Sequence, residues 1–278
     1  MKSATIAEIQ QKLLEIVTYF DSFCTEHGIT YYLMGGSALG ARRHGGFIPW
    51  DDDLDVFLTY DNYRKLINAF RKNIDAYRFY FQEENTEEWP MYFSKLRLNG
   101  TTFIEEDTRY RKMHKGLYID VMCLNNVSSR TVFRYFQYVA ARILTSYTLM
   151  HRGYQTNSIL KKAFMLLSTG LVNIGMKNIL VRFVRCLNNT ETAFVGHLFG
   201  RAKFKNTSFP KYYLGEQRYV QFSNTMLPVP NQVEKYLELR YGKKFMEMPD
   251  ENTKSLYPSH AAFVDLDNHY SKYEKHKN

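Results

Sequence analysis

The feature that most constrains this sequence is an acidic run, DDDLD at residues 51–55, which leads directly into the apolar residues VFL. The pattern predicts a strand over residues 54–58. Alternate side chains of a strand point to the same face, so Asp53 and Asp55 project together while the apolar neighbours face the buried side. Two adjacent carboxylates repel each other unless a cation lies between them. A solvated acidic turn is the alternative interpretation, and the surrounding residues decide between the two.

Two neighbouring features favour a site. A predicted strand over residues 30–34 ends in Gly35-Gly36-Ser37 before a helical turn, which offers backbone N–H groups and a helix N-terminus to an anion. A third carboxylate, Asp120, lies between apolar residues in the predicted strand LYIDVM, where an unpaired buried carboxylate would be costly. Placed together, these residues predict a phosphate cradle opposite a metal site. Hard divalent ions prefer carboxylate oxygens, and a pair of them would activate an attacking hydroxyl and stabilise a leaving phosphate oxygen.

The remaining pattern predicts an α/β (α+β) protein with a mixed-sheet core and an added helical subdomain. Asn99-Gly100 reads as a hairpin turn between two of the strands, and the Pro-rich TMLPVPN at residues 225–231 reads as a loop. Residues 129–188 look helical, with breaks near Gly153 and Gly170. The expected helices are 5–27, 60–72 and 233–241, and the expected strands are 54–58, 79–82, 92–98, 102–105 and 117–122. We divide the chain into a catalytic core (1–125), a basic helical segment (126–190) and a C-terminal section completing the same domain (191–278).

The charge of the chain is unevenly placed. The net charge is +9, yet no Asp or Glu lies between Asp120 and Glu191, a stretch with nine Lys or Arg. Outside it, 28 basic residues balance 28 acidic ones, so the surplus sits in one segment with an expected anionic partner. We expect peripheral membrane contact through residues 129–188, to which Arg134, Arg142, Lys161 and Lys162 contribute. A lipid pyrophosphate or anionic glycan, or a merely solvated basic face, are the alternatives; nucleic acid is not expected.

Cysteine usage points to a reducing compartment. The three cysteines are far apart and show neither metal-ligand nor disulfide spacing. We therefore expect a cytoplasmic protein, peripheral at the inner face of the membrane.

The order of these motifs is similar to that of the DNA polymerase β-like nucleotidyltransferase superfamily. More closely, residues 36–55 (GSALGARRHGGFIPWDDDLD) resemble the signature of the LicD family, phosphocholine transferases related to fukutin. Further similar motifs follow in order: YFSKLRL at 92–98, GLYID at 116–120, LPVP at 227–230 and YG at 241–242. After Asp120 and Val121 the chain continues MCLN, where the family commonly has an aromatic residue, Pro, Leu and Asp.

The resemblance implies transfer of a phospho-alcohol, commonly phosphocholine from CDP-choline, to a sugar hydroxyl of a surface glycan. It implies that Asp53 and Asp55 bind metal, and that Asp120 is the third ligand and the activator of the acceptor hydroxyl. Choline, glycerol, ribitol and ethanolamine all remain open as the alcohol, and lipopolysaccharide, teichoic acid and capsule precursors as the polymer.

Several residues near these motifs suit donor binding. Arg43, Lys95 and Arg97 are cations suited to donor phosphates, with an ordinary surface role as the alternative. Trp50 suits stacking on cytosine or a cation–aromatic contact with choline, with core packing as the alternative. With Gly35, Gly36 and Ser37, these complete the predicted donor site.

We therefore predict an enzyme that uses two Mg²⁺ or Mn²⁺ ions, a CDP-linked alcohol and a glycan acceptor, either free or lipid-linked. One rival is a nucleotidyltransferase that acts on a small molecule or a protein. The other is a non-catalytic glycan- or membrane-binding module.

Overall fold

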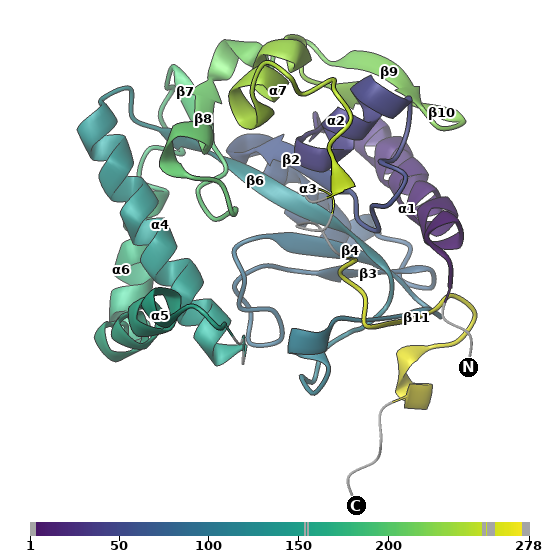
Figure 1. The fold of residues 1–278 in the computed structure, drawn as a ribbon, viewed down its shortest axis with the longest axis horizontal. Helices are drawn as coiled ribbons and strands as arrows, with labels where there is room; N and C mark the ends of the chain where they lie inside the picture. Colours follow the sequence, from purple (N-terminus) through teal and green to yellow (C-terminus); the bar gives the residue numbers. More distant parts are fainter. Residues whose placement is uncertain (1–3, 153, 155, 252–253, 255–258, 274–278) are drawn as a thin grey trace, which may run out of the picture.

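A mixed β-sheet lies at the centre of the protein, as a computed structural model describes it for residues 4–152, 154, 156–251, 254 and 259–273 (Figure 1). Among these residues seven strands form the sheet, in the order β1-β2-β6-β4-β3, with β7 paired to β6 and β8 to β7. Only the β2–β6 pair is parallel in this part of the chain; the other pairs are antiparallel. The strands are β1 (Tyr32–Leu33), β2 (Asp55–Thr59), β3 (Phe79–Gln82), β4 (Ser94–Leu98), β6 (Tyr118–Val127), β7 (Phe194–Gly196) and β8 (Ser208–Pro210). The predicted α/β class with a mixed sheet is confirmed.

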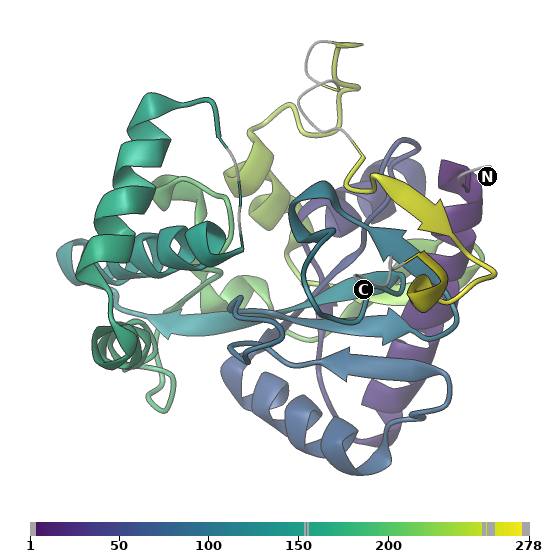
Figure 2. The same ribbon diagram turned by 90° about the horizontal axis from the view of Figure 1, so that it is seen from below.

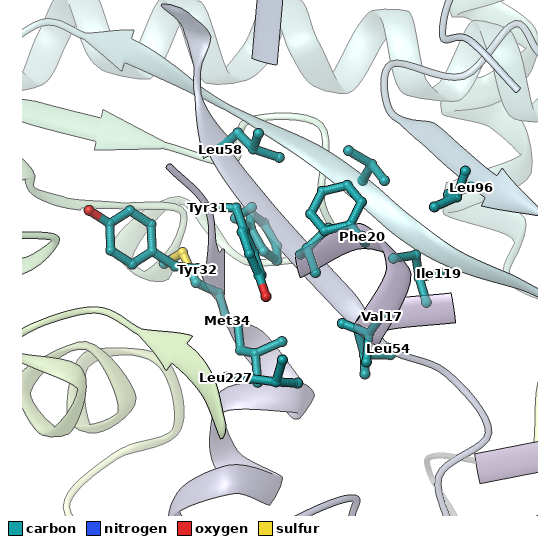
Figure 3. Packing of buried hydrophobic residues seen from close by; sticks show 14 of the residues in the cluster. Val17, Phe20, Tyr31, Tyr32, Met34, Leu54, Leu58, Leu96, Ile119 and Leu227 are labelled. Carbon is teal, nitrogen blue, oxygen red and sulfur yellow. The ribbon is translucent and has the colours of Figure 1, made fainter. Parts of the chain in front are cut away.

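Helices close the sheet and bury its apolar side chains. They are α1 (Ile6–Glu26), α2 (Gly35–His44), α3 (Tyr60–Asn73) and α7 (Val233–Tyr241). α1 begins with a capping box, in which the Thr5 side chain accepts from the Glu8 N–H and the Glu8 carboxylate accepts from the Thr5 N–H. Its apolar stripe, including Val17 and Phe20, packs against Leu54 and Ile119 of the sheet region (Figure 3). The acidic run is therefore attached, through Leu54, to the main hydrophobic core of the protein.

Three further helices gather at one end of the molecule, far from α1 in both views (Figures 1 and 2). They are α4 (Thr131–His151), α5 (Ile159–Leu171) and α6 (Ile174–Val184). A separate apolar cluster around Ala141, Leu144 and Val184 fixes α4 and α6 to the loop after β7. The expected break near Gly153 lies outside the described residues, and the second break falls just after Gly170, at Val172 and Asn173.

The predicted hairpin at Asn99-Gly100 is wrong. Gly100 does occupy a turn with φ +77°, but β4 pairs with β3 and β6, so neither of its edges is free for the next strand. β5 (Thr102–Ile104) pairs instead with β11 (Phe263–Asp265), close to the end of the described chain. The local turn was recognised, but its partner strand lies about 160 residues away.

The predicted loop at residues 225–231 is also largely wrong, because most of it forms β10 (Thr225–Val229). This strand pairs with β9 (Arg218–Phe222) in a two-stranded sheet, and Pro228 lies opposite Tyr219. A two-stranded sheet consists of edge strands, where a residue without an N–H is tolerated.

Candidate active site

The three predicted carboxylates lie at the same end of two neighbouring parallel strands. Asp55 begins β2 and stands in register with Asp120 of β6. Asp53 lies two residues before Asp55, and the Leu54 between them is fully buried while its carbonyl accepts from the Asp120 N–H at 2.9 Å. Residues in register on adjacent strands share a face of the sheet, so Asp55 and Asp120 project on the same side. The structure thus brings together residues that are 65 positions apart in the chain.

This arrangement places negative charges close together. Burial raises the pKa of Asp55 well above its usual range, and repulsion by Asp53 and Asp120 raises it further. Burial also raises the pKa of Asp53. A fourth carboxylate, Asp51, has its pKa raised to about 8, mainly by burial and next by repulsion from Asp53. The carboxylates therefore destabilise one another, and a cation bound among them would relieve that repulsion.

The donor set fits a hard divalent cation by chemistry, since every predicted ligand offers carboxylate oxygens. No group of three or more His, Cys, Asp or Glu side chains in the described part of the chain is already arranged to hold a metal ion. Assignment of Asp53, Asp55 and Asp120 as metal ligands therefore stays a prediction, supported by their type, register and mutual repulsion.

Lys95 is the cation nearest to this group. It stands opposite Asp120 in the β4–β6 register, and its ammonium lies 2.9 Å from the Asp120 carboxylate. The ammonium is also 3.1 Å from the centre of the Tyr118 ring and 5.0 Å from that of Trp89. With 2% of its side chain exposed, Lys95 is a buried partner of the site rather than a surface residue.

Arg97 is more deeply enclosed than the sequence suggested. Its guanidinium donates to the Gln82 side chain at 2.8 Å and to the Gly116 carbonyl at 2.7 Å. The residue is 1% exposed, so the surface alternative considered from the sequence is wrong. Contact with a donor stays a prediction for Arg97.

The Gly35-Gly36-Ser37 turn contacts the acidic run directly. Ser37 Oγ accepts from the Asp55 N–H at 2.8 Å, which fixes the start of β2 against the first turn of α2. Gly35 has φ +60°, and a Cβ there would lie 3.4 Å from an Asp55 carboxylate oxygen; a Cβ on Gly36 would lie 3.3 Å from one of Asp51. The absence of side chains therefore lets the helix N-terminus approach the carboxylates closely. Its role as a phosphate cradle stays a prediction.

Arg43 and Trp50 lie on the C-terminal side of this helix. Arg43 donates to the carbonyls of Phe245 and Glu247, so it holds the segment after α7. Trp50 is half-buried against the main core, and the Lys254 ammonium lies 4.8 Å from its ring centre. Part of the Trp50 side chain therefore packs against the core. Contact with a donor stays a prediction for both Arg43 and Trp50.

Sequence reasoning missed His260. The neighbouring Asp52 is 2% exposed and accepts from the backbone N–H groups of His260 and Ala261, from the Ser259 hydroxyl and from the His260 imidazole. These bonds hold the imidazole 3.6 Å from the Asp53 carboxylate. The hydrogen bond to Asp52 raises the pKa of His260 to about 9, which places a positive charge beside Asp53. Nothing local signals this pairing, because 208 residues separate His260 from Asp52.

Sequence reasoning also missed Tyr236 of α7. Its hydroxyl accepts from the Gly35 N–H at 3.0 Å, so α7 supports the glycine turn from the opposite side. Tyr241, in the same helix, has its hydroxyl 4.0 Å from the Cβ position of Gly35. Both tyrosines lie in the predicted helix 233–241, but no local pattern shows that they contact the glycine turn.

Comparison with known proteins agrees with this geometry. Residues 28–133, which contain the glycine turn and the three carboxylates, match the family model described as "LicD/FKTN/FKRP, nucleotidyltransferase domain". The chain is 26% identical over 270 residues to the lipopolysaccharide cholinephosphotransferase LicD of Haemophilus influenzae, covering 95% of this chain and 100% of that protein. It is 48% identical over 44 residues to the human ribitol 5-phosphate transferase FKRP, covering 16% of this chain and 9% of that one. It is also 24% identical over 178 residues to mannosyltransferase regulator 4 of Saccharomyces cerevisiae, covering 62% of this chain and 15% of that protein.

Proposed function

We propose that this chain, which matches the LicD family model over residues 28–133 and is similar to a LicD cholinephosphotransferase over 95% of its length, is a phosphotransferase of that kind. In this proposal it transfers phosphocholine from CDP-choline to a hydroxyl of a cell-surface glycan. The observation that carries the proposal is the register of Asp55 with Asp120, beside Asp53 and the glycine turn. The full-length similarity to a cholinephosphotransferase that acts on lipopolysaccharide supports both the alcohol and the acceptor class. The short but strong similarity to a ribitol 5-phosphate transferase supports transfer of a different phospho-alcohol as an alternative.

In the proposed reaction, the acceptor oxygen bonds to the phosphorus that carries the alcohol. The bond from that phosphorus to the CMP oxygen breaks, and the hydroxyl proton is removed on the side of Asp120. Asp53 and Asp55 would hold Mg²⁺ or Mn²⁺, which when bound supplies charge for the phosphates and lowers the pKa of the attacking hydroxyl. The Gly35-Gly36-Ser37 turn would receive donor phosphate oxygens.

Lys95 has a positioning role in this proposal. Its ammonium is held between Asp120 and aromatic rings, so it orients the carboxylate while leaving the opposite oxygen for the acceptor. His260 would place positive charge on the far side of Asp53. Positioning and electrostatics would thus do most of the catalysis, as is general for phosphoryl transfer.

The second candidate is transfer of a nucleotide rather than a phospho-alcohol. The matched family model carries the description of a nucleotidyltransferase domain, which favours this alternative. A non-catalytic binding module is disfavoured, because such a module has no need to keep repelling carboxylates in register at the ends of two strands.

The products distinguish these candidates. The protein would be incubated with Mg²⁺, a glycan acceptor and CDP-choline, CDP-glycerol, CDP-ribitol or CDP-ethanolamine in turn. Release of CMP that depends on the acceptor supports the proposal. Release of pyrophosphate from a nucleoside triphosphate, with no CMP from any CDP-alcohol, would support nucleotidyl transfer instead. Asp55→Asn should be inactive, and Asp267→Asn, which changes an exposed carboxylate elsewhere, should be fully active.

A further inference from the structure

The outward side of α5 carries apolar side chains in contact with water. Ile159 and Leu160 are 84% and 83% exposed, and Leu167 and Leu171 are 64% and 70% exposed. Met165 and Ser168 are the buried residues of this helix. A helix on the surface of a water-soluble domain normally shows the opposite distribution.

The positions of the apolar residues around the axis of α5 explain why so many of them are exposed on one side. At 100° per residue, Leu166, Ile159, Ala163, Leu167 and Leu160 fall within one arc, which continues to Leu171 and Phe164 and is about 160° wide. Every residue in this arc is exposed, and none is charged. The opposite side, which packs on α4, includes Ser168, whose hydroxyl donates to the Phe164 carbonyl within the helix. Most apolar side chains of α5 thus lie outside, while the hydroxyl residue Ser168 is buried.

α6 extends the same surface. It follows α5 after only Val172 and Asn173, bent by 108° from it. Ile174, Ile179 and Met176 are 76%, 60% and 42% exposed, while Val184 is buried in the cluster with α4. We call the exposed apolar side chains of these two helices the α5–α6 face.

The charges around the α5–α6 face are positive. Lys161 and Lys162 lie exposed in the first turn of α5, and Arg182 lies exposed on α6. No acidic residue occurs between Asp120 and Glu191. The face therefore combines exposed apolar side chains with cations, which complements a surface that offers both acyl chains and anionic headgroups.

Other basic residues of this segment are used inside the protein. Arg142 donates to the Leu198 carbonyl at 2.9 Å, Arg152 pairs with Asp107 at 2.6 Å and Arg185 pairs with Glu84 at 2.8 Å. Arg142 is half-buried and so is a weaker candidate for a membrane contact than the exposed lysines, and its contribution stays a prediction. Arg134, which donates to the Ser128 carbonyl, is a weaker candidate than Lys161 and Lys162.

We propose that the α5–α6 face docks on the surface of an anionic lipid bilayer, with its apolar side chains inserted and Lys161, Lys162 and Arg182 at the headgroups. The helices lie in the interface and do not cross the bilayer. α5 has 13 residues, about 20 Å at 1.5 Å per residue, against a hydrocarbon core of about 30 Å. Among the described residues no single helix is long and apolar enough to span, and only the bent α5–α6 pair reaches the required length and composition.

A second copy of this chain is a poorer occupant, because two α5–α6 faces would bring like charges together. Docking on a bilayer also agrees with the proposed function, on which this part of the inference rests. A glycan acceptor that is still attached to its lipid would lie at the same membrane surface as the docked enzyme.

The test is co-sedimentation of the full chain with vesicles of phosphatidylcholine alone or with about one-third phosphatidylglycerol. We expect binding to the anionic vesicles that weakens at least fivefold between 0.1 M and 0.5 M NaCl, as headgroup charges are screened. Leu160→Ser with Leu167→Ser should weaken binding at least tenfold, and Lys161→Gln with Lys162→Gln at least threefold. Tyr77→Ser, at an equally exposed aromatic residue away from α5, should bind like the unmodified protein.

Each substituted side chain is exposed, so the circular dichroism spectrum and Tm of each variant should be unchanged. The lysine variant tests the electrostatic part of the docking, and the leucine variant tests the apolar part. No sedimentation with anionic vesicles at low salt would overturn the proposal. So would a dimer of the unmodified protein that becomes monomeric in the leucine variant, since the face would then bind a second copy. Acceptor-dependent CMP release with a soluble acceptor is measured in parallel. Vesicle binding without CMP release would refute the proposed function alone, and CMP release without vesicle binding would refute the docking alone.

Discussion

Asp55→Asn should stabilise the metal-free protein while abolishing its activity. The carboxylate of Asp55 stands in register with Asp120 on the neighbouring strand and two residues from Asp53, and both raise its pKa after burial has done so. Asn keeps the shape of the side chain but removes the charge. The backbone N–H of Asp55, which donates to Ser37, is untouched by the substitution.

The magnitude follows from the geometry. Neighbouring strands are about 4.8 Å apart, and two unit charges at roughly 5 Å repel by about 3 kcal/mol at an effective dielectric constant of about 20. Partial access to water reduces this value, so we expect a gain of about 1–3 kcal/mol in the free energy of unfolding. For domains of roughly 150–250 residues, that corresponds to a rise in Tm of about 2–12 °C.

The neighbouring Asp52 supplies the matched control, with the opposite sign. Burial raises the pKa of Asp52, but hydrogen bonds from His260 and Ser259 outweigh it and hold the pKa at about 2. Asp52→Asn removes the same charge from a site that stabilises it. Because the fold holds this pKa below its usual value, the charged carboxylate stabilises the folded state at neutral pH, and this variant should lose about 1–3 kcal/mol.

Both variants would be unfolded thermally in EDTA and again with 5 mM MgCl₂. Mg²⁺ should raise the Tm of the unmodified protein but not of Asp55→Asn, because binding to the folded state alone stabilises it. The reasoning is refuted if Asp55→Asn destabilises the EDTA-treated protein by more than about 1 kcal/mol. Full turnover of Asp55→Asn, or turnover of the unmodified protein in EDTA, would refute the metal assignment.

Three further predictions concern other parts of the chain. Asp120→Asn should lower turnover by several orders of magnitude and change donor affinity less than fivefold; an equal loss of donor affinity by calorimetry would make Asp120 a donor ligand instead. Arg185→Met leaves Glu84 buried without its 2.8 Å partner and should cost about 3–5 kcal/mol in urea unfolding, whereas Arg71→Met, at an exposed pair, should cost at most about 1 kcal/mol. Equal losses at the two arginines would contradict this. Gly40→Ala should lower the Tm, because its Cβ would lie 2.5 Å from a backbone carbonyl of the following loop, and an unchanged Tm would show that the loop moves freely.

The parts of the fold that the sequence predicts are those determined by local pattern. The alternation around Leu54 predicts which side of the chain is buried. The helix α7 ends at Tyr241, directly before Gly242, where the sequence predicts its end. The strand after Asn99-Gly100 was assigned the wrong partner, because a turn specifies a reversal of direction and not which edge is free. The edge of β4 was taken by β6, a strand whose place in the sheet no local pattern shows.

The same distinction holds for the candidate site: residues marked by a local pattern could be predicted from the sequence, and residues brought in by distant contacts could not. That Asp55 and Asp120 lie together was predictable in part, because an acidic residue between apolar ones in a strand needs a partner or a bound ion. Asp53 was included because it lies two residues before Asp55, and the metal-binding role of all three stays a prediction. His260 was not predictable, because its neighbours carry no periodic pattern and its partner lies 208 residues earlier. The burial of Arg97 was equally hidden, since a cation in a strand reads as a surface residue until the ring and carbonyl that enclose it are known.

The acidic run itself explains why the end of the chain belongs to the site. With alternation of period two, Asp52 points inward like Leu54, and a carboxylate that is 2% exposed must be hydrogen-bonded. The described chain meets that need with donors from residues 259–261, and β11 directly after them pairs with β5. The same contacts bring the His260 imidazole to 3.6 Å from Asp53. One face of the run therefore gathers the predicted catalytic carboxylates, while the other anchors the segment that delivers a positive charge to them. A chain that ended before Ser259 would keep every recognised motif and still leave Asp52 buried without these donors.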